Sequence, residues 1–457
     1  MPVELLDKPD SNSRPIILVS KQAFGDCRLT DQHRAWATAN GFSGEAGRLM
    51  LLPGTDGQIE GALFGLGSDE GSALAVGSLA RKLPEGSWHF DIPPMNPQLA
   101  TLAIVLGGYA FTRYRAKAGK LVRLAVPAGA DRAAVVRVAD GVALARDLIN
   151  TPTNDMGPND LENAARDLAA RHGADVAVVT GDELLEKNFP MIHAVGRASA
   201  EAPRLIDITW GRADARKVTL VGKGVCFDTG GLDIKPANNM LLMKKDMGGA
   251  ANVLGLASML MAARADIRLR VLLPVVENAI SGNAFRPGDI LPSRKGLTVE
   301  IGNTDAEGRL ILADALALAD EEAPDLLIDM ATLTGAARVA LGPDLPPFYT
   351  PDDAFAARLV AASAAVEDPI WRMPLWKPYD SKLSSKVADL NNVTSDGFAG
   401  SITAALFLQR FVEKARTWAH FDIFGWNPTE RPWGPVGGEA QAIRALEAAI
   451  LGEAGQG

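Results

Sequence analysis

The feature that most constrains the fold is the alternation of short apolar runs with longer amphipathic stretches. Residues 16–19 and 50–52 are predicted to be buried strands, whereas residues 31–39 and 71–83 have the apolar spacing of helices. A further strand is predicted near 121–126. Such alternation is typical of α/β proteins, in which helices cover a largely parallel sheet. No internal repeat recurs at a fixed length, which excludes a solenoid or a propeller.

The rest of the chain continues the same alternation. The predicted strands are 205–210, 218–221, 269–276, 326–330 and 420–424, and the predicted helices are 248–263, 310–319 and 439–451. A helical pattern at 134–148 is followed by a polar stretch with Pro152 and Pro158, which is typical of a linker. We therefore predict a small N-terminal α/β domain (1–132), a linker helix (133–150) and a larger C-terminal α/β domain (151–457). A central mixed, mainly parallel sheet is expected in the larger domain.

Composition excludes several classes of protein. The chain has 46 Lys and Arg against 55 Asp and Glu, and its net charge of -9 disfavours nucleic acid as a partner. The two cysteines, Cys27 and Cys226, lie far apart, which excludes a disulfide scaffold and a thiolate zinc site. The acidic N-terminus lacks the pattern of a signal peptide, and the apolar stretch 99–111 is too short to span a bilayer. We expect a cytoplasmic protein without membrane contact.

The densest group of charged residues follows the predicted strand that ends at Val221. Lys223, Asp228, Lys235 and Asp246 lie there among glycines. This segment lacks the third glycine of a dinucleotide-binding loop and the spacing of a phosphate-binding loop. Considered alone, the four charges could simply form two surface ion pairs.

A second acidic segment favours a metal site. Asp305 and Glu307 lie two residues apart at a strand-to-helix turn, where extended backbone would place both side chains on one side. Two such carboxylates repel unless a cation neutralises them, although an acidic helix cap is the simpler alternative. The strands before both segments would bring them to the carboxyl edge of a sheet. Four carboxylates surrounded by Lys223, Lys235 and Arg309 would fit a two-metal site. Only five histidines occur, without an H-E-x-x-H motif, so oxygen atoms would supply most ligands.

At these residues the sequence resembles the cytosolic leucyl aminopeptidases, which are hexameric di-metal exopeptidases. The resemblance rests on three blocks of sequence, which are residues 222–250, residues 303–310 and the Ala-Thr-Leu-Thr-Gly-Ala block at 331–336. It covers about 151–457 well and the first 130 residues only by position and α/β character. Three positions depart from the family pattern, namely Thr229, Asp233 and Lys245. At the position of Lys245 the family commonly has an aromatic residue. The three departures bear on pocket polarity and specificity.

The resemblance implies a role for each residue. One divalent metal, zinc or manganese, would be held by Asp228, Asp305 and Glu307. The second would be held by Lys223, Asp228, Asp246 and Glu307, with Lys223 as a neutral amine. A hydroxide bridging the two metals would attack the peptide, Lys235 would stabilise the oxyanion, and Arg309 would hold a bicarbonate that relays the proton. The residues implied for the substrate pocket are Met243, Thr332, Leu333 and Gly335.

The family also suggests substrates and an assembly. Peptides with a free N-terminus are expected, with a leucine-like apolar preference and a homohexamer as the working state. Two alternatives stay open, namely a DNA-binding or regulatory oligomer and a catalytically silent scaffold. The turn-rich segment 425–438 could form the pocket rim or a subunit contact.

Overall fold

The computed structural model describes residues 3–68, 71–115 and 120–454, which form two compact units. The first unit comprises Met1–Ala143 with Pro428–Val436, and the second comprises Leu144–Asn427 with Gly437–Gly457. The predicted α/β class is confirmed for both units. The predicted domain limits at 132 and 151 stay a prediction.

The first unit is built on a six-stranded sheet in the order β1-β6-β5-β2-β4-β3. Its strands are β1 (Val3–Leu6), β2 (Arg14–Ser20), β3 (Leu49–Pro53), β4 (Ile59–Gly67), β5 (Gly86–Phe90) and β6 (Val122–Ala125). Only β3 pairs antiparallel, with β4, among the described strands of this sheet. Its helices are η1 (Phe24–Asp26), α1 (Asp31–Ala39), η2 (Ala73–Ser78), α2 (Leu79–Lys82) and α3 (Pro97–Gly107).

The single helix predicted at 71–83 is wrong, because two short helices, η2 and α2, occupy this stretch. The hydroxyl of Ser72 accepts the N–H of Leu74, so helical structure starts only after Ser72. Gly77 and Ser78 then interrupt a regular α-helix, for which glycine has a low propensity. A Cβ at Gly77 would lie 2.7 Å from the carbonyl oxygen of Ala103 in α3, so close packing also requires glycine here.

The second unit is built on a nine-stranded sheet in the order β16-β15-β18-β14-β9-β11-β8-β7, with β10 pairing with β11. Its strands are β7 (Asp175–Thr180), β8 (Arg204–Trp210), β9 (Arg216–Gly222), β10 (Gly224–Asp228), β11 (Ile267–Asn278), β14 (Leu326–Ala331), β15 (Pro347–Tyr349), β16 (Trp371–Arg372) and β18 (Trp418–Asp422). The central strands β18, β14, β9, β11 and β10 run parallel, whereas β7, β8 and β15 make antiparallel pairs. The predicted mixed, mainly parallel sheet is confirmed.

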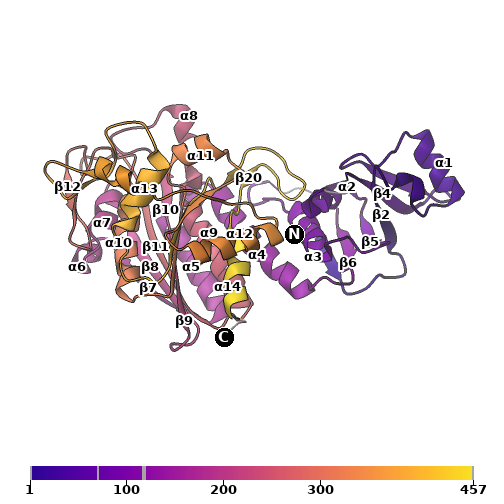
Figure 1. Cartoon of the computed structure of the whole chain (residues 1–457), viewed down its shortest axis with the longest axis horizontal. Helices are drawn as coiled ribbons and strands as arrows, with labels where there is room; N and C mark the ends of the chain where they lie inside the picture. The colour runs from indigo at the N-terminus through magenta and orange to yellow at the C-terminus, as the bar shows by residue number, and fades with distance from the viewer. Residues whose placement is uncertain (1–2, 69–70, 116–119, 455–457) are drawn as a thin grey trace. The chain divides into compact units, whose positions relative to one another are not determined.

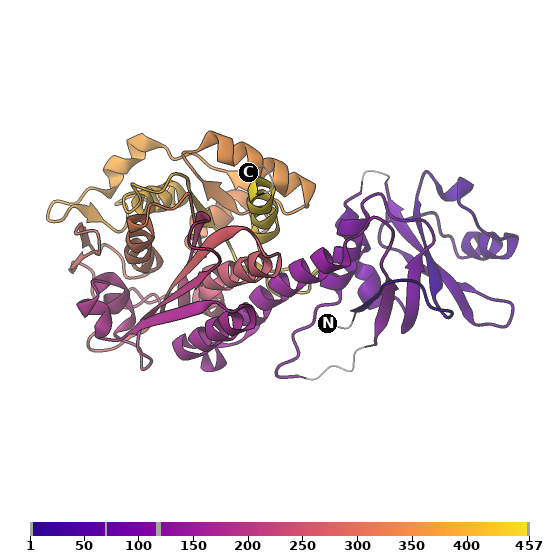
Figure 2. The same ribbon diagram turned by 90° about the horizontal axis from the view of Figure 1, so that it is seen from below.

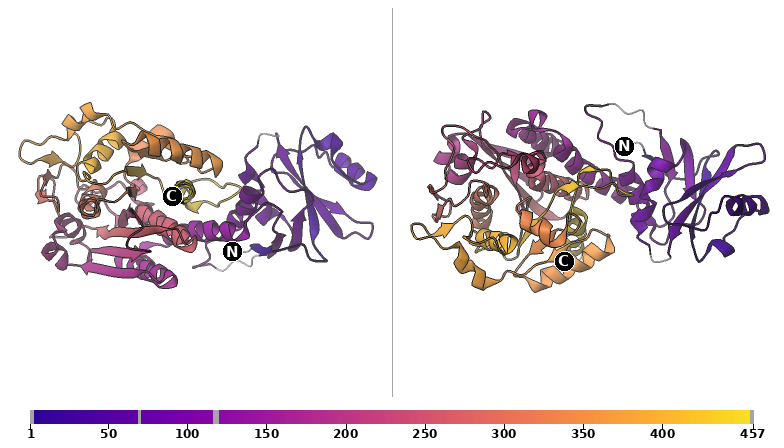
Figure 3. Two further views of the ribbon diagram at one scale, coloured as in Figure 1. Left: turned by 60° about the horizontal axis from the view of Figure 1, so that its bottom comes forward. Right: turned by 90° about the horizontal axis from the view of Figure 1, so that it is seen from above.

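Helices cover both faces of this sheet (Figure 1, Figure 3). One face carries α5 (Pro158–His172) and α9 (Gly248–Ala262), with α14 (Ile443–Ala454) and α12 (Asp353–Ala365) packed outside α9. The other face carries α7 (Pro190–Gly196) and α10 (Gly308–Glu321), and α13 (Gly400–Gln409) packs against α10. Apolar residues of α10 and the strands form one buried cluster, where each large side chain contributes about 1.5–3 kcal/mol.

The remaining elements are short, apart from one long helix. Helix α4 (Arg132–Asn150) begins in the first unit, ends in the second and is uninterrupted (Figure 2). The short helices are η3 (Thr153–Asp155), α6 (Glu183–Glu186), α8 (Ala237–Met240), η4 (Met243–Met247), α11 (Gly335–Leu341) and η5 (Lys377–Leu383). Two small sheets contain β12 (Ile290–Pro292), β13 (Thr298–Glu300), β17 (Leu390–Asn391), β19 (Trp426–Asn427) and β20 (Gly437–Gly438). None of the described helices has the length and apolar character that a bilayer crossing requires.

The start of the last helix differs from the prediction. Helix α14 begins at Ile443 instead of 439, because Ala442 has a φ of 65°, which a right-handed helix cannot include. Residues 428–436 return to the first unit, where the guanidinium of Arg81 donates to the carbonyl oxygen of Arg431 at 2.7 Å.

Glycine is required where α9 begins against the sheet. A Cβ at Gly249 would lie 2.1 Å from the carbonyl oxygen of Met330 and 2.9 Å from the backbone nitrogen of Lys223. We predict that Gly249→Ala pushes α9 away from β9 and β14 and lowers the free energy of unfolding by about 1–3 kcal/mol. Gly282→Ala is the matched control, since a Cβ there meets nothing within 4 Å. Equal denaturation midpoints for the two variants would contradict this packing.

Candidate metal centre

The carboxyl ends of neighbouring strands carry the charged residues of the first segment. Lys223 directly follows β9, and Asp228 is the last residue of β10. Asp246 lies in η4, immediately before α9. Because parallel strands place their carboxyl ends at one edge, residues far apart in sequence meet there.

Asp305 and Glu307 reach this edge by a different route from the predicted one. The strand before them, β13, lies in a separate three-stranded sheet with β12 and β17, so the prediction that both preceding strands end at one sheet edge is wrong. Glu307 also has helical backbone angles, with φ -71° and ψ -37°, and not the extended backbone that was expected. It is the residue just before α10, and the packing of α10 on β9 brings it to the site.

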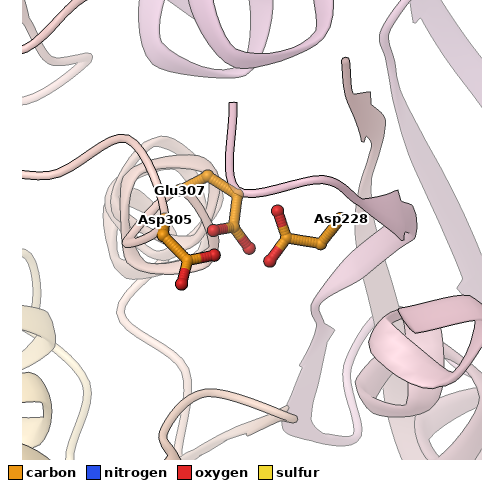
Figure 4. A group of neighbouring side chains, drawn as sticks. All are labelled: Asp228, Asp305 and Glu307. Carbon is orange, nitrogen blue, oxygen red and sulfur yellow. The ribbon is translucent and has the colours of Figure 1, made fainter. Parts of the chain in front are cut away.

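Three carboxylates meet at this point. One oxygen each from Asp228, Asp305 and Glu307 lies within 4.8 Å of the others. Figure 4 shows the carboxylates of Asp228 and Glu307 pointing toward one another, with Asp305 beside them. Asp228 and Glu307 are buried, whereas Asp305 is more exposed.

Two lysines face these carboxylates. Nζ of Lys223 lies 2.7 Å from Oδ2 of Asp246 and 3.0 Å from Oε1 of Glu307. Nζ of Lys235 lies 2.7 Å from Oδ2 of Asp228 and also contacts Asp305. The structure therefore brings all five predicted metal ligands and Lys235 into one cluster.

The electrostatics of the cluster indicate an excess of negative charge. Burial and the nearby Asp246 raise the pKa of Asp228 to about 6, and burial and Asp228 raise the pKa of Glu307 to about 7. Burial alone would lower the pKa of Lys223, but Asp246 and Glu307 raise it above its ordinary value. Four carboxylates face two ammonium groups, so the cluster favours further cations.

The donor atoms fit divalent metals. Oδ2 of Asp246 and Oε1 of Glu307 are buried, and within the described residues they share one charged neighbour, the ammonium of Lys223 at 2.7 and 3.0 Å. One ammonium shared by two buried carboxylates does not balance their charge, so a further cation would stabilise them. An oxygen-rich set with one amine nitrogen suits zinc or manganese.

Residues outside the predicted set hold the carboxylates in position. The amide of Asn278 donates to Oδ1 of Asp228 at 2.8 Å, and the N–H of Gly230 donates to the same oxygen at 2.9 Å. The hydroxyl of Thr332 lies 2.8 Å from Oδ1 of Asp246. Asn278 was not identified from the sequence, because its proximity to Asp228 arises only from the register of β10 and β11.

Arg309 lies beside the cluster in the first turn of α10. It is buried, its Nη1 donates to the carbonyl oxygen of Asn392 at 2.6 Å, and burial lowers its pKa to about 10. Its Nε has no hydrogen-bond partner within the described residues. A buried, free donor of this kind can bind an anion.

A pocket of about 310 Å³ opens beside the cluster. Lys235 and Asp305 line it, together with the predicted pocket residues Met243, Thr332 and Gly335. Leu333 packs instead against the hydrophobic core of the unit, and its N–H donates to Asp422. Its predicted role in the pocket stays a prediction.

Comparison with known proteins agrees with the resemblance seen in the sequence. The catalytic-domain model of the cytosol aminopeptidase family matches residues 143–446, and the N-terminal-domain model of M17 aminopeptidases matches residues 15–127. The protein of Roseiflexus castenholzii named "Probable cytosol aminopeptidase" is 41% identical over 396 residues, which cover 81% of each chain. The protein of the same name from Corynebacterium efficiens is 39% identical over 435 residues, covering 89% of this chain and 85% of the relative.

Solved structures show the same similarity. The crystal structure of cytosol aminopeptidase from Coxiella burnetii superposes with a TM-score of 0.93 at 46% identity and covers 98% of each chain. The bottromycin maturation enzyme BotP in complex with Mn has a TM-score of 0.88 at 33% identity, covering 97% of this chain and 100% of BotP.

Gly308 makes room for Lys223. A Cβ at Gly308 would lie 2.3 Å from Cε and 2.7 Å from Nζ of Lys223. We predict that Gly308→Ala displaces this amine from Asp246 and Glu307 and lowers the metal content from two ions per chain toward one. Elemental analysis after dialysis at limiting metal measures the change, and Gly282→Ala is the control. Equal metal content in both variants would contradict a role for Lys223 in metal binding.

Proposed function

The chain belongs to the cytosol aminopeptidase family of metallo-exopeptidases, and we propose that the cluster around Asp228 and Glu307 is its catalytic di-metal centre. The observation that carries this proposal is the excess of buried carboxylates over lysines at the carboxyl edge of the sheet. The enzyme removes N-terminal residues from peptides, and the adjoining pocket is the proposed site of the leaving residue's side chain.

Each proposed ligand contributes an atom that faces the cluster. The first metal would be held by Asp228, Asp305 and Glu307, and the second by Lys223, Asp228, Asp246 and Glu307. When bound, divalent metals supply Lewis acidity, which polarises the scissile carbonyl and makes a water more acidic. We propose zinc or manganese, and the presence of Mn in the BotP structure supports manganese as a candidate. Lys223 can act as a ligand only after losing its proton, so metal binding and proton release are coupled.

Two cationic side chains are proposed to act on the reacting groups. Although burial lowers the pKa of Lys235, Asp228 and Glu307 raise it above its ordinary value, so the ammonium stays charged at neutral pH. Because Lys235 also lines the pocket, it can donate to the carbonyl oxygen of the substrate as negative charge develops there. Arg309, with its free Nε, is the proposed holder of a bicarbonate that moves the proton.

The assembly and the location rest on the resemblance to the family. We propose a homohexamer on the basis of that resemblance, and a cytoplasmic location in line with the names of the relatives. The comparisons give no support to the DNA-binding alternative, and the net charge of -9 opposes it.

The exopeptidase reaction predicts a strict need for a free N-terminus. A peptide with a free α-amine should lose residues one at a time when the enzyme is supplied with manganese or zinc, whereas its N-acetylated form should stay intact. The acetyl group removes the amine lone pair and adds bulk beside the carboxylates. Mass spectrometry of both peptides, with and without a chelator, measures the outcome. Internal cleavage, equal hydrolysis of the acetylated peptide, or full activity after exhaustive chelation would each refute this function.

A substitution of Lys235 can distinguish a role in catalysis from a role in metal binding. We predict that Lys235→Ala keeps two metals per chain but lowers kcat by roughly 10²–10³, because one stabilising contact to the oxyanion is lost. Steady-state kinetics with elemental analysis measures both quantities. Lys414→Ala is the matched control, since Lys414 is an exposed lysine outside the pocket. A normal kcat in the Lys235 variant would remove this residue from the reaction.

A further inference from the structure

Lys245 is a buried lysine in the wall of the substrate pocket. It lies in η4 directly before Asp246, is 5% exposed and lines the pocket together with Arg338 and Phe424. Its Nζ lies 4.9 Å from the centroid of the Phe424 ring, and the guanidinium carbon of Arg338 lies 4.9 Å from the same centroid. Two cations therefore border one aromatic ring inside the pocket.

Neither cation has an acidic partner within the described residues. The ammonium of Lys245 makes no ion pair or hydrogen bond there, and the guanidinium of Arg338 makes none either. The adjacent carboxylate of Asp246 is already engaged, because Lys223 lies 2.7 Å from its Oδ2 and the hydroxyl of Thr332 lies 2.8 Å from its Oδ1.

Asp422, an acidic residue that lines the same pocket, also accepts hydrogen bonds from other groups. Oδ1 of Asp422 accepts the N–H groups of Leu333 and Thr334 at 3.1 and 3.0 Å. Its Oδ2 accepts the hydroxyls of Thr334 and Ser401 at 2.5 and 2.9 Å. The nearby carboxylates of Asp246 and Asp422 thus have other hydrogen-bond or ion-pair partners, and within the described residues neither forms an ion pair with Lys245 or Arg338.

A buried ammonium without a carboxylate partner is costly, and a ligand that brings a carboxylate removes that cost. We propose that Lys245 and Arg338 bind the side-chain carboxylate of an N-terminal glutamate or aspartate. This inference rests on the proposed function of the pocket. The enzyme would accept acidic N-terminal residues in addition to the apolar ones that Met243 suits.

The position of Lys245 and Arg338 indicates that they would contact the side chain of the N-terminal residue that the reaction releases. Lys245 is two residues from Met243, and both line the same pocket as Thr332 and Gly335. Lys235 and Asp305, where the reacting bond is proposed to lie, line that pocket too. A volume of about 310 Å³ is at the lower end for ligand sites, so it fits one side chain near the metal centre better than a long peptide. The aliphatic stem of glutamate can contact Met243 while its carboxylate reaches the two cations.

Glutamyl and glutaminyl reporter substrates test this inference, because they match in size and differ in charge. For the metal-supplemented enzyme we expect kcat/KM for the glutamyl reporter to exceed that for the glutaminyl reporter by at least about tenfold, as for a charge-assisted hydrogen bond. Lys245→Met should reduce this ratio to near one. Arg338→Met should reduce the ratio as well. Because Arg338 is exposed, this variant should fold even if the substitution of the buried Lys245 prevents folding. Lys414→Met, at an exposed lysine outside the pocket, is the matched control and should keep the ratio.

Binding of the products provides a second measurement that does not depend on turnover. Calorimetric titration should show tighter binding of free glutamate than of glutamine, and both pocket variants should abolish the difference. A ratio near one in the unmodified enzyme, or a ratio that neither variant changes, would overturn the inference while leaving leucyl activity intact. A preference for glutamate only at the second position of a peptide would overturn the assignment to the N-terminal side chain. No hydrolysis of any reporter would instead refute the proposed function.

Discussion

The mutual repulsion of four carboxylates, three of them buried, is the constraint on which the site depends. Asp228, Asp246, Asp305 and Glu307 come from three separate parts of the chain, and in the described residues their ion pairs are with Lys223 and Lys235. A protein tolerates such a cluster when nearby cations offset the free-energy cost of desolvating the acids. The raised pKa values of Asp228 and Glu307, about 6 and about 7, express that cost. A divalent cation would bring more charge in a small volume than another ammonium group could, which is why the proposed ligands suit such an ion.

The fold meets this constraint through close backbone packing at one sheet edge. Gly249 lets α9 start against Lys223 and Met330, and Gly308 leaves space for the stem of Lys223. Both glycines lie at the first turns of helices that cover opposite faces of the sheet (Figure 1). The backbone of Lys223 is thereby packed against α9, and its side chain against the start of α10. A longer or more mobile connection would let the carboxylates separate.

Much of the fold and most of the cluster were predictable from the sequence, because buried strands and charged residues among glycines leave strong local patterns. Strand β9 and helix α10 lie close to their predicted ranges. The route of Glu307 was not predictable, since β13 is a short strand whose partner β17 lies far along the chain. The supporting Asn278 was missed for a similar reason: only the register of β10 and β11 places it beside Asp228. Long-range pairing therefore accounts for these errors, whereas local propensity accounts for the successes.

The short helix η4 contributes residues to both the carboxylate cluster and the pocket. Asp246 and Lys245 are neighbours in it, yet one faces Lys223 and the other lines the pocket. The hydroxyl of Thr332 lies 3.0 Å from the carbonyl oxygen of Asp246 and 2.8 Å from its Oδ1, so the backbone of η4 is held at the acid. A substitution at position 245 can therefore change the charge of the pocket while the carboxylate beside it keeps its place. Two consecutive residues of η4 thus face the cluster and the pocket separately, so a lysine fits at 245 without displacing the carboxylate of Asp246.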